Sequence, residues 1–118
     1  MGKLTTHVLD VSIGLPAAGV RIDLHDRSPS RGQQLLHSMV TGMDGRCEAP
    51  LLADGQFHSG LFALIFHVGD YFRARGVVLP EPALFDQVVI QLGIARPHEH
   101  YHVPLLITPW SYSVYRGG

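Results

Sequence analysis

The chain has 118 residues, of which 46% are hydrophobic and 16% are charged, and its formal net charge is −1. This composition predicts one globular domain over residues 1–118 and excludes a disordered chain, a collagen and a coiled coil. The basic residues are few and scattered, so the sequence also excludes an electrostatic footprint for nucleic acid or for an anionic membrane.

The single cysteine and the first residues favour the cytoplasm. Cys47 has no other cysteine in the chain with which to form a disulfide, and no Cys/His spacing around it is typical of a metal or redox site. The first residues lack the apolar segment of a signal peptide, and the longest apolar runs are too short for a membrane-spanning helix. We therefore expect a cytoplasmic protein with a structural cysteine.

The first half of the chain reads as short strands separated by turns. Residues 4–11 are rich in β-forming side chains and end at a Gly-Leu-Pro break. Residues 19–25 alternate apolar and polar side chains, which predicts a half-buried strand. A third strand is expected at 34–41. Residues 61–68 are almost continuously apolar and predict a strand that is buried on both faces.

The second half adds one helical turn and three more strands. Residues 71–76 are the only helical candidate, and strands are expected at 85–92, 98–108 and 110–116. Pro104 lies inside the second of these strands and predicts an edge or a bulge there, because proline has no N–H group to donate. Short strands at roughly even spacing predict an all-β sandwich, whose edge strands are often covered by neighbouring subunits.

Eight histidines are the strongest chemical signal in the composition. His98, His100 and His102 alternate along the chain, so all three lie on one face if the segment is extended. This spacing suits a zinc site, since neutral imidazole is a common zinc ligand, and it also suits the solvated face of a strand. His102 leads directly into an apolar run, which would hold it rigidly enough to act as a base. His7 and Arg46, each taken alone, read as a structural histidine and a solvated turn residue.

Four segments carry recognisable motifs: Leu4–Asp10 (LTTHVLD), Asp44–Arg46 (DGR), Tyr101–Leu106 (YHVPLL) and Ser111–Gly117 (SYSVYRG). Together and in this order they resemble the transthyretin-like 5-hydroxyisourate hydrolases over nearly the whole chain. The resemblance implies an all-β, transthyretin-like (prealbumin-like) sandwich of two sheets and eight strands with one short helix. It also implies a homotetramer built as a dimer of dimers, with the active site in the channel where the dimers face each other.

The resemblance further implies a hydrolase that opens the ring of 5-hydroxyisourate in urate degradation, a part of purine catabolism, without a cofactor. The implied product is 2-oxo-4-hydroxy-4-carboxy-5-ureidoimidazoline. His7, Arg46 and His102 match the catalytic set of this family. Substrate binding falls to His7 and Arg46 together with the closing residues Tyr115, Arg116, Gly117 and Gly118. The family pattern usually ends in serine, so a hydroxyl group is missing at Gly118.

Two other functions stay open at this stage. The first is a non-catalytic module that binds a small ligand on the same fold without converting it. Apolar residues in place of His7, Arg46 and His102 would favour this module, and the chain does not have them. The second is a zinc-binding protein that uses His98, His100 and His102. Metal analysis of the purified protein distinguishes this function from the other two.

Overall fold

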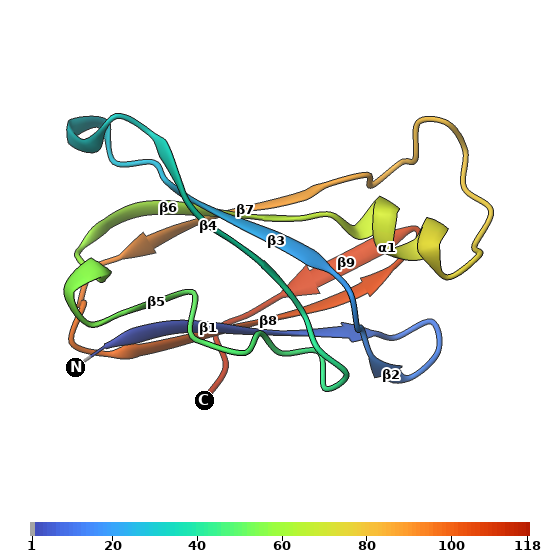
Figure 1. Cartoon of the computed structure of the whole chain (residues 1–118), viewed down its shortest axis with the longest axis horizontal. Coiled ribbons are helices and arrows are strands. Elements are labelled where there is room, and N and C mark those ends of the chain that lie inside the picture. The colour runs from blue at the N-terminus through green and yellow to red at the C-terminus, as the bar shows by residue number, and fades with distance from the viewer. Residues whose placement is uncertain (1) are drawn as a thin grey trace.

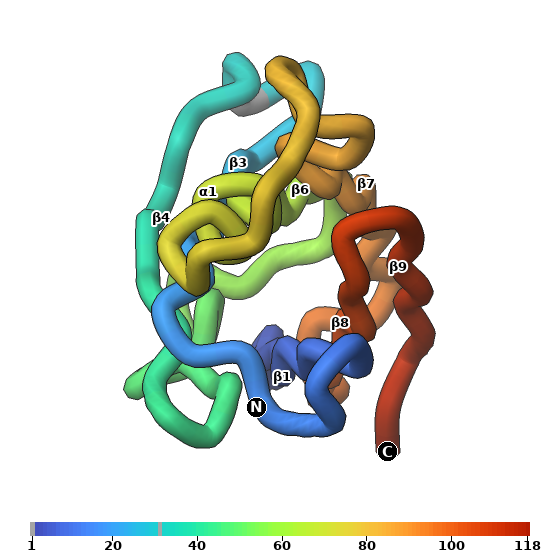
Figure 2. The backbone as a smooth tube through the Cα atoms, turned by 90° about the vertical axis from the view of Figure 1, so that its right-hand side faces the viewer, coloured from blue at the N-terminus to red at the C-terminus, as the bar shows by residue number. Residues whose placement is uncertain are grey.

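The computed structural model describes residues 2–118, which form two β-sheets that face each other across an apolar core (Figure 1). The first sheet joins, in order, β2 (Leu15–Pro16), β1 (Lys3–Asp10), β8 (His100–Thr108) and β9 (Ser111–Val114), and β5 (Leu52–Ala53) also pairs with β1. The second sheet joins β4 (Gln34–Val40), β3 (Arg21–Asp26), β6 (Gly60–Phe66) and β7 (Val88–Ile94). Figure 2 shows the two layers from one end, with β1, β8 and β9 below β3, β4 and β6.

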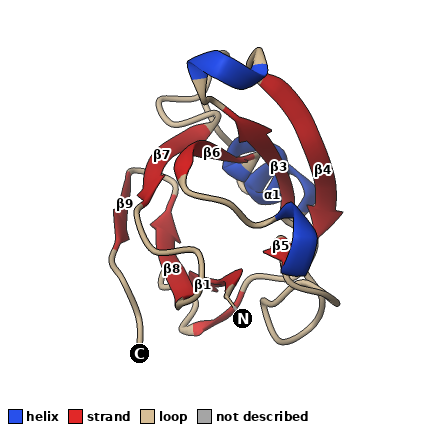
Figure 3. Cartoon of the chain, turned by 90° about the vertical axis from the view of Figure 1, so that its left-hand side faces the viewer, coloured by secondary structure: helices blue, strands red, loops and turns tan. Residues whose placement is uncertain are grey.

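Helical structure in the described residues is short. The helix α1 (Val68–Ala74) follows β6, and two 3-10 turns lie at Pro29–Arg31 and Asp54–Gln56 (Figure 3). The helix begins three residues before the predicted span 71–76, because the chain leaves the sheet at His67 and at once buries Val68 and Phe72. Within residues 2–118, no helix is long and apolar enough to cross a membrane.

The core lies between the sheets because the strands alternate apolar and polar side chains. In β1, Leu4 and Val8 are completely buried, whereas Thr5 and His7 lie on the opposite face. The largest buried side chains come from both sheets and from α1, and they include Phe62, Phe66, Phe72, Ile22 and Leu105. Burying a side chain of this size contributes about 1.5–3 kcal/mol.

The parallel pair of β1 and β8 brings the first and third motifs of the sequence side by side. The pairing runs without interruption from Lys3 opposite His100 to Asp10 opposite Ile107. In this register Thr5 lies opposite His102. The fold thus places residues that are far apart in the chain on one face of the first sheet.

Pro104 lies in a strand with neighbours on both sides, although the sequence predicted an edge or a bulge. The β8–β9 pairing starts with Leu105 opposite Val114, and the next contact on that side is the bridge between His102 and Gly117. The N–H group of Gly117 donates to the carbonyl of His102. Backbone groups two residues further along a strand face the same side, so Pro104 faces the gap in this pairing. The missing N–H group therefore breaks no ladder hydrogen bond.

Several strand boundaries differ from the predicted ones. β8 begins at His100 rather than at residue 98, because a turn precedes it in which the N–H group of Glu99 donates to the carbonyl of Arg96. β7 begins three residues later than predicted, and β9 ends two residues earlier. The two-residue strands β2 and β5 were not predicted, since they are too short to show an alternating pattern.

Candidate active site

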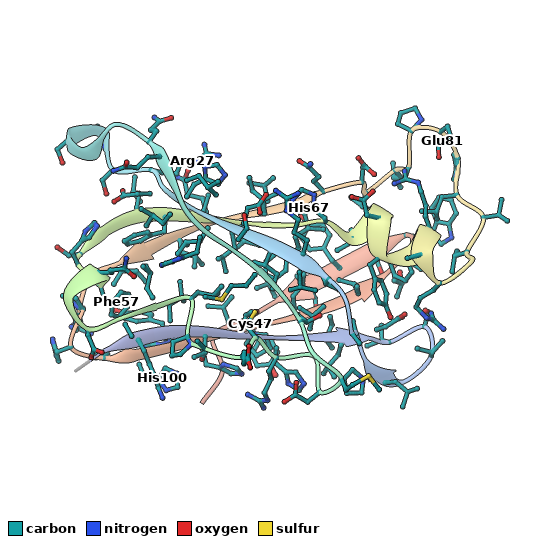
Figure 4. All side chains as sticks on the ribbon, viewed as in Figure 1. Arg27, Cys47, Phe57, His67, Glu81 and His100 are labelled. Atoms are coloured by element: carbon teal, nitrogen blue, oxygen red, sulfur yellow. The ribbon has the colours of Figure 1, made fainter. Side chains whose placement is uncertain are left out.

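The outer face of the first sheet gathers polar side chains of β1 and β8. Strand alternation places Lys3, Thr5 and His7 of β1 on this face, and His100 and His102 of β8 beside them. Figure 4 shows His100 pointing away from the second sheet. Two of the three predicted catalytic residues thus lie on the same face of adjacent strands.

One hydroxyl group links the two histidines of β8. Oγ1 of Thr5 lies 2.9 Å from Nε2 of His100 and 2.8 Å from Nδ1 of His102. The centroids of the two imidazole rings are 6.2 Å apart. Thr5 therefore contacts one nitrogen of the His102 ring and leaves Nε2, the other nitrogen, free of this contact.

Arg46 reaches this face through the turn that precedes it. The carbonyl of Gly45 accepts a hydrogen bond of 2.9 Å from the N–H group of Val8 in β1. The backbone of Gly45 has a φ of 77°, and a Cβ atom at this position would lie 3.1 Å from Cδ2 of His7. The turn is thus fastened directly against His7, which places the next residue, Arg46, beside the two strands.

Burial and positive charge act together on His102. Burial lowers the pKa of its imidazole, and the charges of Arg46, His100 and His7 lower this pKa further. Both effects disfavour the imidazolium form. His102 is therefore neutral near pH 7 and has a lone pair on one ring nitrogen, as a general base requires.

A pocket of about 200 Å³ adjoins this face. It lies between β1 and the segment that leads into β5, and its wall includes Lys3, Thr5, Arg46 and Cys47. Burial raises the pKa of the Cys47 thiol, and the charge of Asp44 raises it further. The thiol thus stays protonated, which agrees with the structural role expected for it.

The C-terminal segment packs against His102. The N–H group of Gly117 donates a hydrogen bond of 2.7 Å to the carbonyl of His102. A Cβ atom at Gly117 would lie only 2.8 Å from Cδ2 of the His102 ring. Glycine at this position lets the backbone lie against the imidazole, and Gly118 follows directly.

The side chain of Arg116, unlike the neighbouring Gly117 backbone, contacts Tyr101, Glu99 and the carbonyl of His100. Its guanidinium lies 4.2 Å from the ring centroid of Tyr101, and Nη2 is 3.1 Å from a carboxylate oxygen of Glu99 and 3.3 Å from the carbonyl of His100. The hydrogen bond from Arg116 lowers the pKa of Glu99. The structure thus brings the Gly117 backbone to the His102 ring and holds the Arg116 guanidinium on Tyr101 and Glu99. The side chain of Tyr115 is exposed.

The predicted common face of three alternating histidines is wrong at His98. This residue lies exposed in the turn before β8, so only His100 and His102 project from the strand together. Among the side chains that the structure describes, no three histidine, cysteine, aspartate or glutamate residues are arranged to hold a metal ion. The segment thus offers two imidazoles bridged by a hydroxyl group rather than a zinc-ligand set.

The sequence did not indicate the contacts that Thr5 makes with His100 and His102, or the contact of Glu99 with Arg116. The alternation of β1 already places Thr5 on the face of His7, and this was the available signal. The contact with two histidines nearly a hundred residues away depends on the β1–β8 register, which no local pattern specifies.

Comparisons with known proteins agree with this geometry. Residues 4–117 match the model of the HIUase/Transthyretin family. A 5-hydroxyisourate hydrolase of Pseudomonas aeruginosa is 53% identical over 117 residues, which are 99% of this chain and 92% of the relative. The structure of Klebsiella pneumoniae 5-hydroxyisourate hydrolase is 33% identical, with a TM-score of 0.83 and full coverage of both chains. An (S)-allantoin synthase structure is 43% identical, with a TM-score of 0.94, over 99% of this chain and 44% of that chain.

These similarities extend over the whole sandwich and include both motif-bearing strands. The transthyretin-like fold predicted from the sequence is confirmed. The chain belongs to the HIUase/Transthyretin family.

Proposed function

We propose that this chain hydrolyses 5-hydroxyisourate to 2-oxo-4-hydroxy-4-carboxy-5-ureidoimidazoline in urate degradation. Relatives that are about half identical over the full chain carry the name 5-hydroxyisourate hydrolase. The observation that carries the proposal is the meeting of His7, Arg46 and His102, which come from three separate segments, on one face of the first sheet. A module that binds a small ligand without converting it does not require a general base beside an arginine.

Opening a cyclic amide requires an activated water molecule and stabilisation of the negative charge that develops on the carbonyl oxygen. We assign His102 as the base that takes a proton from the water, because its depressed pKa keeps it neutral. We assign the guanidinium of Arg46 to bind the ring oxygens and the oxyanion. Removing one electrostatic group of this kind commonly costs on the order of 100- to 1000-fold in rate.

His7 and the C-terminal segment complete the proposed site. His7 lies against the Gly45 turn, and we assign it to orient the water molecule or to donate a proton to the leaving nitrogen. Gly117 packs on His102, and its neighbours Tyr115, Arg116 and Gly118 are proposed to bind substrate. At Gly118 only backbone groups are available for this role.

We further propose a homotetramer, a dimer of dimers, in which the outer faces of the first sheets enclose the substrate. The open outer face and the pocket beside Thr5 and Arg46 support this arrangement, because substrate bound to one chain alone would stay exposed to water. Light scattering coupled to size-exclusion chromatography measures the assembly. A cytoplasmic location stays a prediction.

The direct test generates 5-hydroxyisourate in situ with urate oxidase and follows its ultraviolet absorbance with and without the protein. The hydrolase proposal predicts decay faster than the spontaneous rate, and unchanged activity after treatment with a metal chelator. Decay at the spontaneous rate would instead favour the non-catalytic binding module. Stoichiometric zinc that is lost together with activity on chelation would favour the zinc protein.

A further inference from the structure

Building on the hydrolase function proposed above, we propose that Thr5 and His100 form a positioning pair that selects the tautomer of His102. In this pair the Thr5 hydroxyl hydrogen points to His100, which leaves its oxygen to accept the Nδ1–H group of His102. His102 then presents an unprotonated Nε2 to the reaction. Protonation of His100 reverses this arrangement and switches the base off.

A hydroxyl group between two imidazoles can donate to only one of them. It carries one hydrogen to donate, and neutral imidazole has one N–H donor and one acceptor nitrogen. Oγ1 of Thr5 lies within 2.9 Å of a nitrogen from each ring, so both contacts are hydrogen bonds. If the hydroxyl donates to one ring, its oxygen accepts from the other. The tautomers of His100 and His102 are therefore linked through Thr5.

Of the two arrangements in which the Thr5 hydroxyl donates to a ring, only one yields an active base. When Thr5 donates to Nε2 of His100, it accepts from Nδ1 of His102, and the lone pair of His102 lies on Nε2. When Thr5 donates to His102 instead, the proton of neutral His102 lies on Nε2 and no base faces the substrate. The same logic governs hydrolases in which an acceptor beside a catalytic histidine fixes its tautomer.

The charge of His100 decides between the two arrangements. Protonated His100 has only donors, so its Nε2 no longer accepts the Thr5 hydroxyl hydrogen. The remaining ring nitrogen within reach of that hydrogen is Nδ1 of His102. His100 is exposed, whereas His102 is partly buried. A fall in pH therefore acts on the tautomer of His102 through protonation of His100.

Five other ionisable groups of the described residues surround this pair. They are Lys3 opposite His100 on β1, Arg116 at the His100 carbonyl with its partner Glu99, and Arg46 and His7 beside His102. None of these groups forms a hydrogen bond with the Thr5 hydroxyl in the described structure, whereas His100 and His102 both do. The tautomer link thus runs through Thr5 alone.

The test combines activity with a direct measurement of the tautomer. Nitrogen-15 NMR of the histidine rings, recorded without substrate, distinguishes Nδ1–H from Nε2–H imidazole. We expect His102 in the Nδ1–H form at pH 8 and a move towards Nε2–H as His100 gains its proton. This measurement needs no turnover, so it stays informative even if the hydrolase proposal fails in the absorbance assay.

Two substitutions at Thr5 separate positioning from packing. Thr5→Val keeps the β-branched shape and removes the hydroxyl, and we expect kcat to fall by about tenfold to a hundredfold with little change in KM. Thr5→Ser restores the hydroxyl and should recover kcat to within about threefold of the wild type. His102 in the Nε2–H form at pH 8, or full kcat in Thr5→Val, would overturn the proposal.

The pH profile tests the role of His100. Glutamine at this position accepts the Thr5 hydrogen through its amide oxygen but cannot be protonated. In His100→Gln the acid limb of kcat/KM should therefore shift to lower pH. His98→Gln is the matched control, since it removes an exposed imidazole that does not contact Thr5, and its acid limb should stay in place. Equal profiles for all three proteins would contradict the switch.

Discussion

Gly45 holds the Arg46 turn against β1, and we predict that Gly45→Ala lowers both the stability of the protein and its activity. An alanine Cβ atom would lie 2.3 Å from the carbonyl oxygen of Val8 and 3.1 Å from Cδ2 of His7. A backbone oxygen cannot move aside as the end of a flexible side chain does. The turn must therefore shift away from β1, and it takes the guanidinium of Arg46 with it.

The size of the effect follows from two contributions. A left-handed residue with a Cβ atom costs about 1–2 kcal/mol, and the φ of Gly45 is 77°. The hydrogen bond from Val8 to Gly45 adds about 0.5–1.5 kcal/mol if it is lost. We expect the free energy of unfolding to fall by about 2–3 kcal/mol. A misplacement of Arg46 approaching 1 Å would lower kcat/KM by up to about 100-fold.

Gly76→Ala provides the matched control. Gly76 also has a positive φ, of 84°, but a Cβ atom there would meet nothing within 4 Å. This variant should lose about 1–2 kcal/mol and keep its activity. Urea unfolding at fixed protein concentration measures the stability, and the absorbance assay measures kcat/KM. Wild-type activity in Gly45→Ala, together with a stability no lower than that of Gly76→Ala, would contradict this prediction.

Three further predictions concern the C-terminal segment and the second sheet. Gly117→Ala should displace the backbone from His102 and lower kcat/KM at least about tenfold with little loss of thermal stability, since a Cβ atom would lie 2.8 Å from the ring; full activity would contradict this contact. Glu99→Gln removes the ion pair of Arg116 and should raise KM by no more than about fivefold, because an exposed ion pair contributes little; a fall in kcat would argue against a binding role. Burial raises the pKa of Asp23, but hydrogen bonds from Ser38, His67 and Arg21 outweigh burial and lower the pKa to about 2. Asp23→Asn should therefore lower the free energy of unfolding by its full amount above about pH 4, and by progressively less as the pH falls towards 2. Urea unfolding that shows the same loss at every pH would contradict this prediction.

The elements with a clear alternating pattern were predictable from the sequence. Residues 4–11 predict β1 because Leu4, Thr6 and Val8 face the core while Thr5 and His7 face outwards. The proposed catalytic set was predicted through motifs, since His7 and Arg46 read as ordinary residues when each is taken alone. The predicted helix began too late because residues 61–68 form one apolar run, and hydrophobicity alone does not show where a buried strand becomes a buried helix.

The contacts that govern the proposed chemistry were not predictable. The hydrogen bonds of Thr5 to His100 and His102 exist because β1 and β8 pair in parallel with one particular register. A shift of one residue would turn Thr5 to the other face. The position of Arg116 on Tyr101 likewise depends on the path of the chain after β9. Local patterns predict faces of elements, whereas the register between distant strands is a property of the whole fold.

In the proposed hydrolase, the cluster on the outer face of β1 and β8 carries the hydrolysis of 5-hydroxyisourate. The most direct measurement is kcat/KM of the wild type, His102→Ala and Arg46→Ala on freshly generated substrate, with the oligomeric state checked for each protein. We predict an active wild type and a loss on the order of 100-fold or more in each variant at unchanged assembly. Variants that match the wild type, or a folded wild type that leaves the spontaneous decay unchanged, would contradict this proposal.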